Sequence, residues 1–208
     1  YIMPSGRSSF GSTTKHTNHL QLIRMMMKSL PRDLARASSL EDVFGLLLDY
    51  PTIGRFLAYQ YATDINYSEV VDFDEDSFVA AGPGAMDGIN KCFSSLGKYT
   101  PEQVIDLVVA SQEEEFERRG LAFKSLWGRR LKLIDCQNLF CEISKYSRVA
   151  HPEWVGSSGR NKIKQRFHQT PGHIDYWFPP KWGINDRVAE TMSTACRKPE
   201  TVQQSLAL

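Results

Sequence analysis

Residues 78–93, FVAAGPGAMDGINKCF, carry the clearest local signals in the chain. A short apolar run stops at Gly82, and apolar residues then return at helical spacing. Gly-Pro-Gly between two helical patterns predicts a tight turn, because Gly82 can end a helix in a left-handed conformation and Pro83 fixes its own φ angle. Gly84 has no Cβ, so another group can approach its backbone, and the free N–H groups of the next helix favour an anion such as phosphate. Taken alone, the stretch fits a plain corner between two helices equally well.

Composition limits the class of protein. The 208 residues are 41% hydrophobic and 24% charged, which is typical of a folded globular protein. The net charge of +1 means that a nucleic-acid site has to be a local patch. The four cysteines have no paired spacing and resemble reduced intracellular thiols. No apolar run approaches membrane-spanning length and no signal peptide is visible, so no membrane partner is expected. The first residue is Tyr1, so we expect an excerpt of a longer protein. We expect an intracellular, nuclear location.

Helical patterns dominate, and strand signals are weak throughout. We expect an all-α fold, a helical bundle with an irregular C-terminal lobe. Residues 1–19 are rich in Ser, Thr and Gly and predict a flexible tail. Residues 20–150 are expected to form the helical core, and residues 151–208 an irregular Trp-rich, Pro-rich and basic lobe packed on that core. The expected helices cover residues 20–30, 39–50, 51 to about 65, 73–84, 100–119 and 185–197. A further helix is expected to start at Gly84, and another near Asp135 within the dense stretch of residues 131–149.

Two helix starts are marked by capping residues. Ser39 stands at an N-cap position with Asp42 three residues later. Thr100 is a stronger signal, because Pro101 follows it at the favoured first position and Gln103 takes the capping-box position.

Three stretches in order suggest more than a bundle: LAYQYATD in residues 57–64, AAGPGAMDGI in residues 80–89 and LIDCQNLFCEI in residues 133–143. This order resembles the helix-hairpin-helix DNA glycosylase superfamily. There, a first segment carries a Gln that enters the gap left by an extruded base. A Gly-rich hairpin then grips the DNA backbone through its amides, and a later segment supplies the catalytic Asp.

The sequence differs from that superfamily at positions that limit which reactions we expect. Lyases carry a Lys two residues after the second hairpin Gly, and this position is Met86 here, so a Schiff-base lyase is not expected. The Cys quartet that holds an iron–sulfur cluster in some members is absent. Gln60 is displaced by one position from the family pattern. Asp135 lies further after Gly84 than in compact glycosylases, and the 100–119 helix looks like the insertion responsible.

A narrower resemblance extends over most of the chain after residue 38. YQYATDINYS, FVAAGPGAMDGINKCF, IDCQNLFCEISKY and WFPPKWGI are similar to the helical domain of hydroxymethyluracil DNA kinases. The related α-glutamyl/putrescinyl-thymine pyrophosphorylases share it. The resemblance implies a domain that handles thymine derivatives in DNA, with double-stranded DNA carrying a modified pyrimidine as partner. No G-x-x-x-x-G-K-[ST] loop occurs, so a kinase activity would need a further domain or a partner protein.

The resemblance assigns roles to individual residues. The target base would be flipped into a pocket and held by stacking and edge hydrogen bonds. Trp127 is a further stacking candidate. The expected catalytic residues are Asp135, Glu142 and Lys145. The expected DNA-binding residues are Gln60, Gly82, Pro83, Gly84, Lys91, Arg160, Lys162 and Lys164. The expected base-pocket residues are Tyr59, Tyr61, Asp64, Gln137 and Tyr146.

Structural interpretations of the same residues stay open. Asp135 also fits a helix cap, for which Asp is favoured. Glu142 and Lys145 also fit a surface pair three residues apart. The basic run at residues 160–166 also fits a solvated edge. His151 and His173 lack ligand spacing, so no metal site and no cofactor are expected.

Three functions remain for this domain. The first is a glycosylase-like domain that recognises a flipped hydroxymethyluracil-type base and modifies it with Asp135. The second is a non-catalytic reader of modified DNA. The third is a monofunctional base-excision glycosylase. A purely structural helical domain is the alternative to all three.

Overall fold

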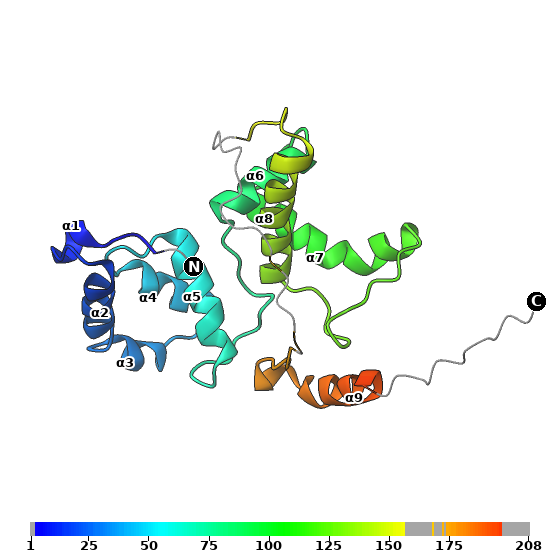
Figure 1. Ribbon diagram of the computed structural model, residues 1–208. Helices are drawn as coiled ribbons and strands as arrows, with labels where there is room; N and C mark the ends of the chain where they lie inside the picture. The colour runs from blue at the N-terminus through cyan, green and yellow to red at the C-terminus, as the bar shows by residue number, and fades with distance from the viewer. Residues whose placement is uncertain (1–2, 157–167, 169–171, 173, 197–208) are drawn as a thin grey trace, which may run out of the picture. The chain divides into compact units, whose positions relative to one another are not determined.

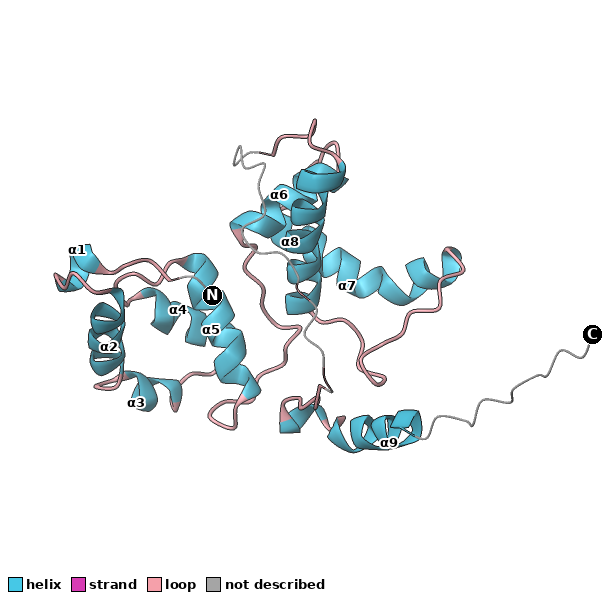
Figure 2. Ribbon diagram, viewed as in Figure 1, coloured by secondary structure: helices cyan, strands magenta, loops and turns pink. Residues whose placement is uncertain are grey.

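The computed structural model describes residues 3–156, 168, 172 and 174–196. All named secondary-structure elements in these ranges are helices, which confirms the all-α prediction (Figures 1 and 2). Two compact units are present, one of residues 1–122 and 131–168 and the other of residues 123–130 and 169–208. The elements are α1 (Arg7–Phe10), α2 (Lys15–Met26), α3 (Leu30–Leu34), α4 (Leu40–Leu48), α5 (Arg55–Tyr67), α6 (Pro83–Cys92), α7 (Pro101–Arg118), α8 (Leu133–Ala150), the 3-10 turn η1 (Pro180–Trp182) and α9 (Asn185–Cys196).

The segment expected as a tail contains α1 and the start of α2. The buried side chain of Asn18 explains why this segment is folded. Its amide nitrogen donates to the Ser5 and Ser12 carbonyl oxygens at 2.9 and 3.0 Å, and its oxygen accepts the Ser12 N–H at 3.0 Å. One buried amide therefore joins the first loop to α2.

Helices α4 and α5 pack along a shared apolar face. Ser39 begins α4, and its Oγ accepts the Asp42 N–H at 3.0 Å, as the capping pattern predicts. Burying apolar side chains along this face supplies the main stabilisation of the pair. The helix expected to open at Pro51 begins later, at Arg55. The buried side chains of this face include Val43, Phe44, Leu47, Leu57, Ala58 and Ala62.

The helix expected over residues 73–84 is wrong, because the chain from Ser68 to Gly82 is non-helical. Asn66, buried at the end of α5, holds the Phe73 backbone by two hydrogen bonds of 2.9 and 3.0 Å. Asp74 then makes a local turn by accepting the Asp76 N–H at 3.0 Å. Phe78 packs its ring against those of Phe44 and Tyr59. Side chain–backbone bonds thus replace helical ones along this segment.

Helices α6 and α8 form the tightest pair (Figure 1). Gly84 and Gly88 are four residues apart, so they lie on one face of α6. A Cβ on Gly84 would lie 2.9 Å from Cys141 Sγ, and a Cβ on Gly88 would lie 1.9 Å from the Phe140 carbonyl oxygen. Only glycine leaves room for this approach of the two backbones.

Helix α7 begins at the predicted capping box. Thr100 Oγ1 accepts the Gln103 N–H at 3.2 Å, and Gln103 Oε1 accepts the Thr100 N–H at 2.9 Å. Near the other end, buried Gln112 exchanges hydrogen bonds of 2.9 and 3.0 Å with the Leu131 backbone. These bonds fix the chain just before α8.

The second unit is held by aromatic rings. Tyr176 stacks on Phe178 with 3° between the rings and a centroid separation of 6.3 Å, and Phe178 stacks on Trp182 at 5.9 Å. Trp127 contacts both Tyr176 and Phe178. The Arg129 guanidinium lies 4.0 Å from the centroid of the Trp182 ring. The rings of this unit therefore pack on one another.

Candidate functional site

Helix α6 begins at Pro83, inside the Gly-Pro-Gly turn and one residue before Gly84, where the sequence led us to expect its start. Gly82 has a φ of −75° and is extended, so the expected left-handed helix end does not occur. Its N–H donates to Gln137 Oε1 of α8 at 3.2 Å. Gly84 faces the Cys141 thiol. The turn therefore serves the α6–α8 contact, and phosphate binding at its amides stays a prediction.

Three of the residues expected near a base are interior. Gln60 and Tyr59 are buried on α5, and Gln137 is buried on α8. Burial raises the pKa of Tyr59 far above its usual value, and the charges of Tyr67 and Asp135 add to this effect. Gln60 Nε2 is buried and has no hydrogen-bond partner within the described ranges. These side chains are core groups in this conformation.

The other expected base-pocket residues are more accessible. Tyr61 is half-buried, and its burial raises the pKa of its hydroxyl. Asp64 is largely exposed, and partial burial raises the pKa of its carboxyl. Tyr146 is 65% exposed on α8 and packs edge-on against the His151 ring.

The three expected catalytic residues lie along α8. Asp135 is in the first turn, and its Oδ2 accepts the Lys132 N–H at 2.8 Å, so it acts as a cap. Glu142 and Lys145 form an exposed ion pair of 2.5 Å. Because a helix rises about 1.5 Å per residue, Glu142 lies about 10 Å along the axis from Asp135. The structural interpretations of these residues thus match the observed contacts, and their catalytic roles stay predictions.

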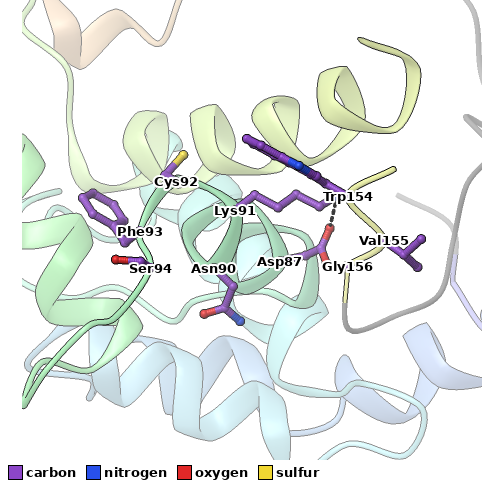
Figure 3. A pocket seen from close by; sticks show the side chains of 9 residues that line it. All are labelled: Asp87, Asn90, Lys91, Cys92, Phe93, Ser94, Trp154, Val155 and Gly156. Carbon is purple, nitrogen blue, oxygen red and sulfur yellow. Dashed lines mark ion pairs between the residues drawn. The ribbon is translucent and has the colours of Figure 1, made fainter. Parts of the chain in front are cut away.

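Lys91 is the predicted DNA-binding residue that the structure places in a pocket. Arg160, Lys162 and Lys164 lie outside the described residues. The pocket has a volume of about 550 Å³. Figure 3 shows that α6 forms one wall and the segment after α8 another, with Phe93 and Ser94 at the end opposite Val155 and Gly156. Its lining residues are Asp87, Asn90, Lys91, Cys92, Phe93, Ser94, Trp154, Val155 and Gly156.

A buried charge cluster lies at this pocket. The Asp87 side chain is 2% exposed, and its Oδ2 accepts the Ser144 hydroxyl at 2.5 Å and pairs with Lys91 Nζ at 3.0 Å. Arg148 lies 3.9 Å from the same oxygen. Burial raises the pKa of Asp87, but the hydrogen bonds from Ser144 and Lys91 and the charges of Lys91 and Arg148 outweigh it and lower the pKa. The Asp87 carboxyl is therefore ionised at neutral pH.

The cluster leaves two polar atoms unsatisfied. Asp87 Oδ1 and Arg148 Nε are buried and have no hydrogen-bond partner in the described part of the chain. The Asp87 oxygen can only accept and the Arg148 nitrogen can only donate. A polar ligand that carries both a hydrogen-bond donor and an acceptor would suit such a site. This pocket is therefore the best-supported candidate site.

Sequence reasoning missed Asp87, although it stands beside the turn and four residues before Lys91. That spacing predicts an ion pair on one helix face. Nothing in the local sequence shows that Ser144 and Arg148 bury the pair. Both residues belong to α8, and Ser144 stands 57 residues after Asp87.

No metal-ligand cluster of His, Cys, Asp and Glu is found among the described residues. No helix in the described ranges is long and apolar enough to cross a membrane.

Comparison with known proteins gives the family. The sequence model of the family described as "5-hmdU DNA kinase, helical domain" matches residues 1–156. The chain belongs to this family. The predicted resemblance to the helical domain of hydroxymethyluracil DNA kinases is therefore confirmed. The residues matched to this 5-hmdU DNA kinase helical domain include α1 to α8 and every residue that lines the pocket.

A curated relative supports the same assignment. A "5-hmdU DNA kinase" of Bacillus phage SP10 is 29% identical over 147 residues, which are 65% of this chain and 23% of that protein. The chain thus spans less than a quarter of the length of this relative. No solved structure matches the chain.

Proposed function

We propose that this chain is a DNA-recognition domain that binds duplex DNA containing 5-hydroxymethyluracil and presents that base for modification. The observation that carries the proposal is the family match over residues 1–156, which includes the whole of α1 to α8. Phosphate transfer to the base would be carried out by another part of the protein or complex. The chain contains no phosphate-binding loop of the G-x-x-x-x-G-K-[ST] kind, and the kinase of phage SP10 is much longer.

A chain with a net charge of +1 needs a local surface for DNA. Phosphate contacts are proposed for the α6 start and for the basic residues at 160–164. Such contacts make affinity fall steeply with salt, and the slope counts the phosphates that are neutralised. A duplex form of the DNA and a nuclear location remain proposals of the same kind.

Within this proposal, the reader form is favoured over a catalytic one. Asp135 caps α8 through Oδ2, and Glu142 and Lys145 pair with each other on the surface further along the same helix. Groups that act on one reacting atom have to lie within hydrogen-bond distance of it. A spread of about 10 Å along the helix makes it difficult for Asp135 and Glu142 to share a substrate atom.

The test compares binding of the 208-residue chain to two duplexes that differ at one position, thymine against 5-hydroxymethyluracil. We expect tighter binding to the modified duplex in fluorescence anisotropy and a loss of affinity as salt rises. Equal affinity for both duplexes, or no binding at low salt, would contradict the proposal. Incubation followed by analysis for a released or altered base separates reader from enzyme. If turnover occurs, its loss in Asp135→Asn with folding intact would return Asp135 to the mechanism.

A further inference from the structure

The two oxygens of Asp87 have different surroundings. Oδ2 is bound by Ser144 and Lys91, with Arg148 behind them. Oδ1 has no hydrogen-bond partner in the described part of the chain, although it is as deeply buried. Leaving a buried acceptor unpaired is destabilising, and more so for a charged one. An ionised oxygen in this state is a binding position for a hydrogen-bond donor.

The donor would come from the pocket, which Asp87 lines. The pocket volume of about 550 Å³ is within the range of small-molecule sites and exceeds the size of one nucleoside. The Gly156 backbone covers Oδ1, since a Cβ at that residue would lie 1.7 Å from it. A ligand that reaches Oδ1 therefore takes the place of the Gly156 backbone.

Further donors stand beside this acceptor. The Lys91 ammonium has three N–H groups, of which the described contacts use two, to Asp87 Oδ2 and to the Ser144 carbonyl oxygen at 3.5 Å. The Asn90 side chain lies on the exposed side of the same helix and lines the pocket. The site thus offers one strong acceptor with donors next to it.

An aromatic surface completes the pocket. Trp154 is 56% exposed, and its ring stacks on His151 at 5.2 Å with 23° between the planes. Figure 3 shows the Trp154 ring beside the Lys91 side chain, near Asp87. An exposed indole held by a second ring is a suitable surface for stacking a planar heterocycle such as a base.

We propose that this pocket binds the flipped uracil-type base itself. The base N3–H donates to Asp87 Oδ1, a base carbonyl oxygen accepts from Lys91 or Asn90, and the ring stacks on Trp154. This assignment rests on the proposed function, because the family concerns 5-hmdU in DNA. It places the base at α6 and the segment after α8, away from buried Tyr59 and Gln137.

The arrangement also predicts which bases are rejected. Uracil-type bases carry an N–H between two carbonyl groups, so a donor faces Asp87 with an acceptor on either side. A cytosine-type base has an unprotonated ring nitrogen at that position, which would face the carboxylate with a lone pair. Leaving both acceptors unpaired is costly, so we expect discrimination against 5-hydroxymethylcytosine.

The experiment uses the 208-residue chain and three duplexes, identical except for one position that holds 5-hydroxymethyluracil, 5-hydroxymethylcytosine or an abasic site. Asp87→Asn and Trp154→Ala are compared with Glu114→Gln and Trp177→Ala, which change an exposed α7 carboxylate and an exposed indole of the second unit. Circular dichroism and urea unfolding establish that each variant is folded. The exposed Trp154 keeps the test valid if Asp87→Asn lowers stability.

We expect Asp87→Asn and Trp154→Ala each to weaken binding to the hydroxymethyluracil duplex about tenfold, the loss of one charge-assisted hydrogen bond or one stacked base. Binding to the abasic duplex should be unchanged, because only backbone contacts remain there. Wild-type affinity of both variants for the hydroxymethyluracil duplex would overturn this inference and leave the proposed function intact. Failure of the wild-type chain to bind any of the duplexes would overturn both.

Discussion

Gly88 on α6 lies so close to Phe140 on α8 that a Cβ at residue 88 would stand 1.9 Å from the Phe140 carbonyl oxygen. The obstructing atom belongs to the backbone, so a side-chain movement cannot relieve the contact. The separation of these two helices is therefore set at Gly88, and everything built on the pair depends on it, including the pocket at Asp87 and Lys91.

Gly88→Ala should separate α6 from α8 and destabilise the fold. We expect a loss of roughly 2–4 kcal/mol in the free energy of unfolding, as for overpacking against an immobile group. Gly45 on α4 is the matched control, because nothing lies within 4 Å of its ideal Cβ. Gly45→Ala should stabilise the chain by up to about 1 kcal/mol, the helix preference of Ala over Gly. Urea unfolding of both variants checks this, and equal effects would show that the close contact has no energetic consequence.

Asp87 should make stability depend on acid. Since the pKa of its folded-state carboxyl is below the usual value, its contribution is complete above the unfolded pKa, near 4, and is lost as pH falls through the lower folded pKa. The difference in unfolding free energy between the wild-type chain and Asp87→Asn should therefore be largest above pH 5 and shrink below pH 4. Urea unfolding between pH 3 and pH 7 measures it. A difference that stays constant over this range would contradict the ion cluster of Asp87, Lys91 and Arg148.

Asp135 should contribute to stability through the start of α8. Its Oδ2 accepts the Lys132 N–H, so Asp135→Ala should cost about 1 kcal/mol, while Asp135→Asn keeps an oxygen acceptor and should cost less. Glu142→Gln is the comparison, because the exposed Glu142–Lys145 pair should contribute well under 1 kcal/mol. Thermal or urea unfolding ranks the three. If Asp135→Ala were no more costly than Glu142→Gln, the cap would be energetically unimportant.

Local signals predicted much of the fold. Ser39 and Thr100 cap α4 and α7 as expected, because a cap involves groups only three residues apart. The sequence also indicates the helical class. The resemblance to the helical domain of hydroxymethyluracil DNA kinases came from four short stretches and is confirmed by the match over residues 1–156.

The remaining features of the fold and of the candidate site could not be predicted, because they depend on contacts between residues far apart in the sequence. Gly82 and Gly84 predicted a tight turn whose backbone another group could approach. The groups that approach it, Gln137 and Cys141, belong to α8. The Asp87 cluster was missed for the same reason, since Ser144 and Arg148 bury it from another helix. The acidic residues at 74–76 suggested a helix start, but Asp76 instead accepts the Leu133 N–H at the start of α8, at 3.3 Å. Spacing along the chain carries no information about such partners.

Asn66 should be among the most sensitive polar residues of the fold. Its buried side chain accepts the Phe73 N–H and donates to the Phe73 carbonyl oxygen, which keeps the 68–82 segment out of a helix. Asn66→Ala removes both bonds and leaves two backbone groups unpaired, so we expect a loss of about 3 kcal/mol. Asn66→Asp keeps the acceptor but cannot donate, and it should also be destabilising.

Ser68→Ala is the control for Asn66, since Ser68 also bonds backbone groups but is exposed. It should cost under about 1 kcal/mol, because water can replace the lost bonds. Urea unfolding gives the energies, and hydrogen exchange of the Phe73 amide reports the local bond directly. Exchange at Phe73 that is equally slow in Asn66→Ala and in the wild-type chain would show that the segment is held by Phe78 and its ring contacts and not by Asn66.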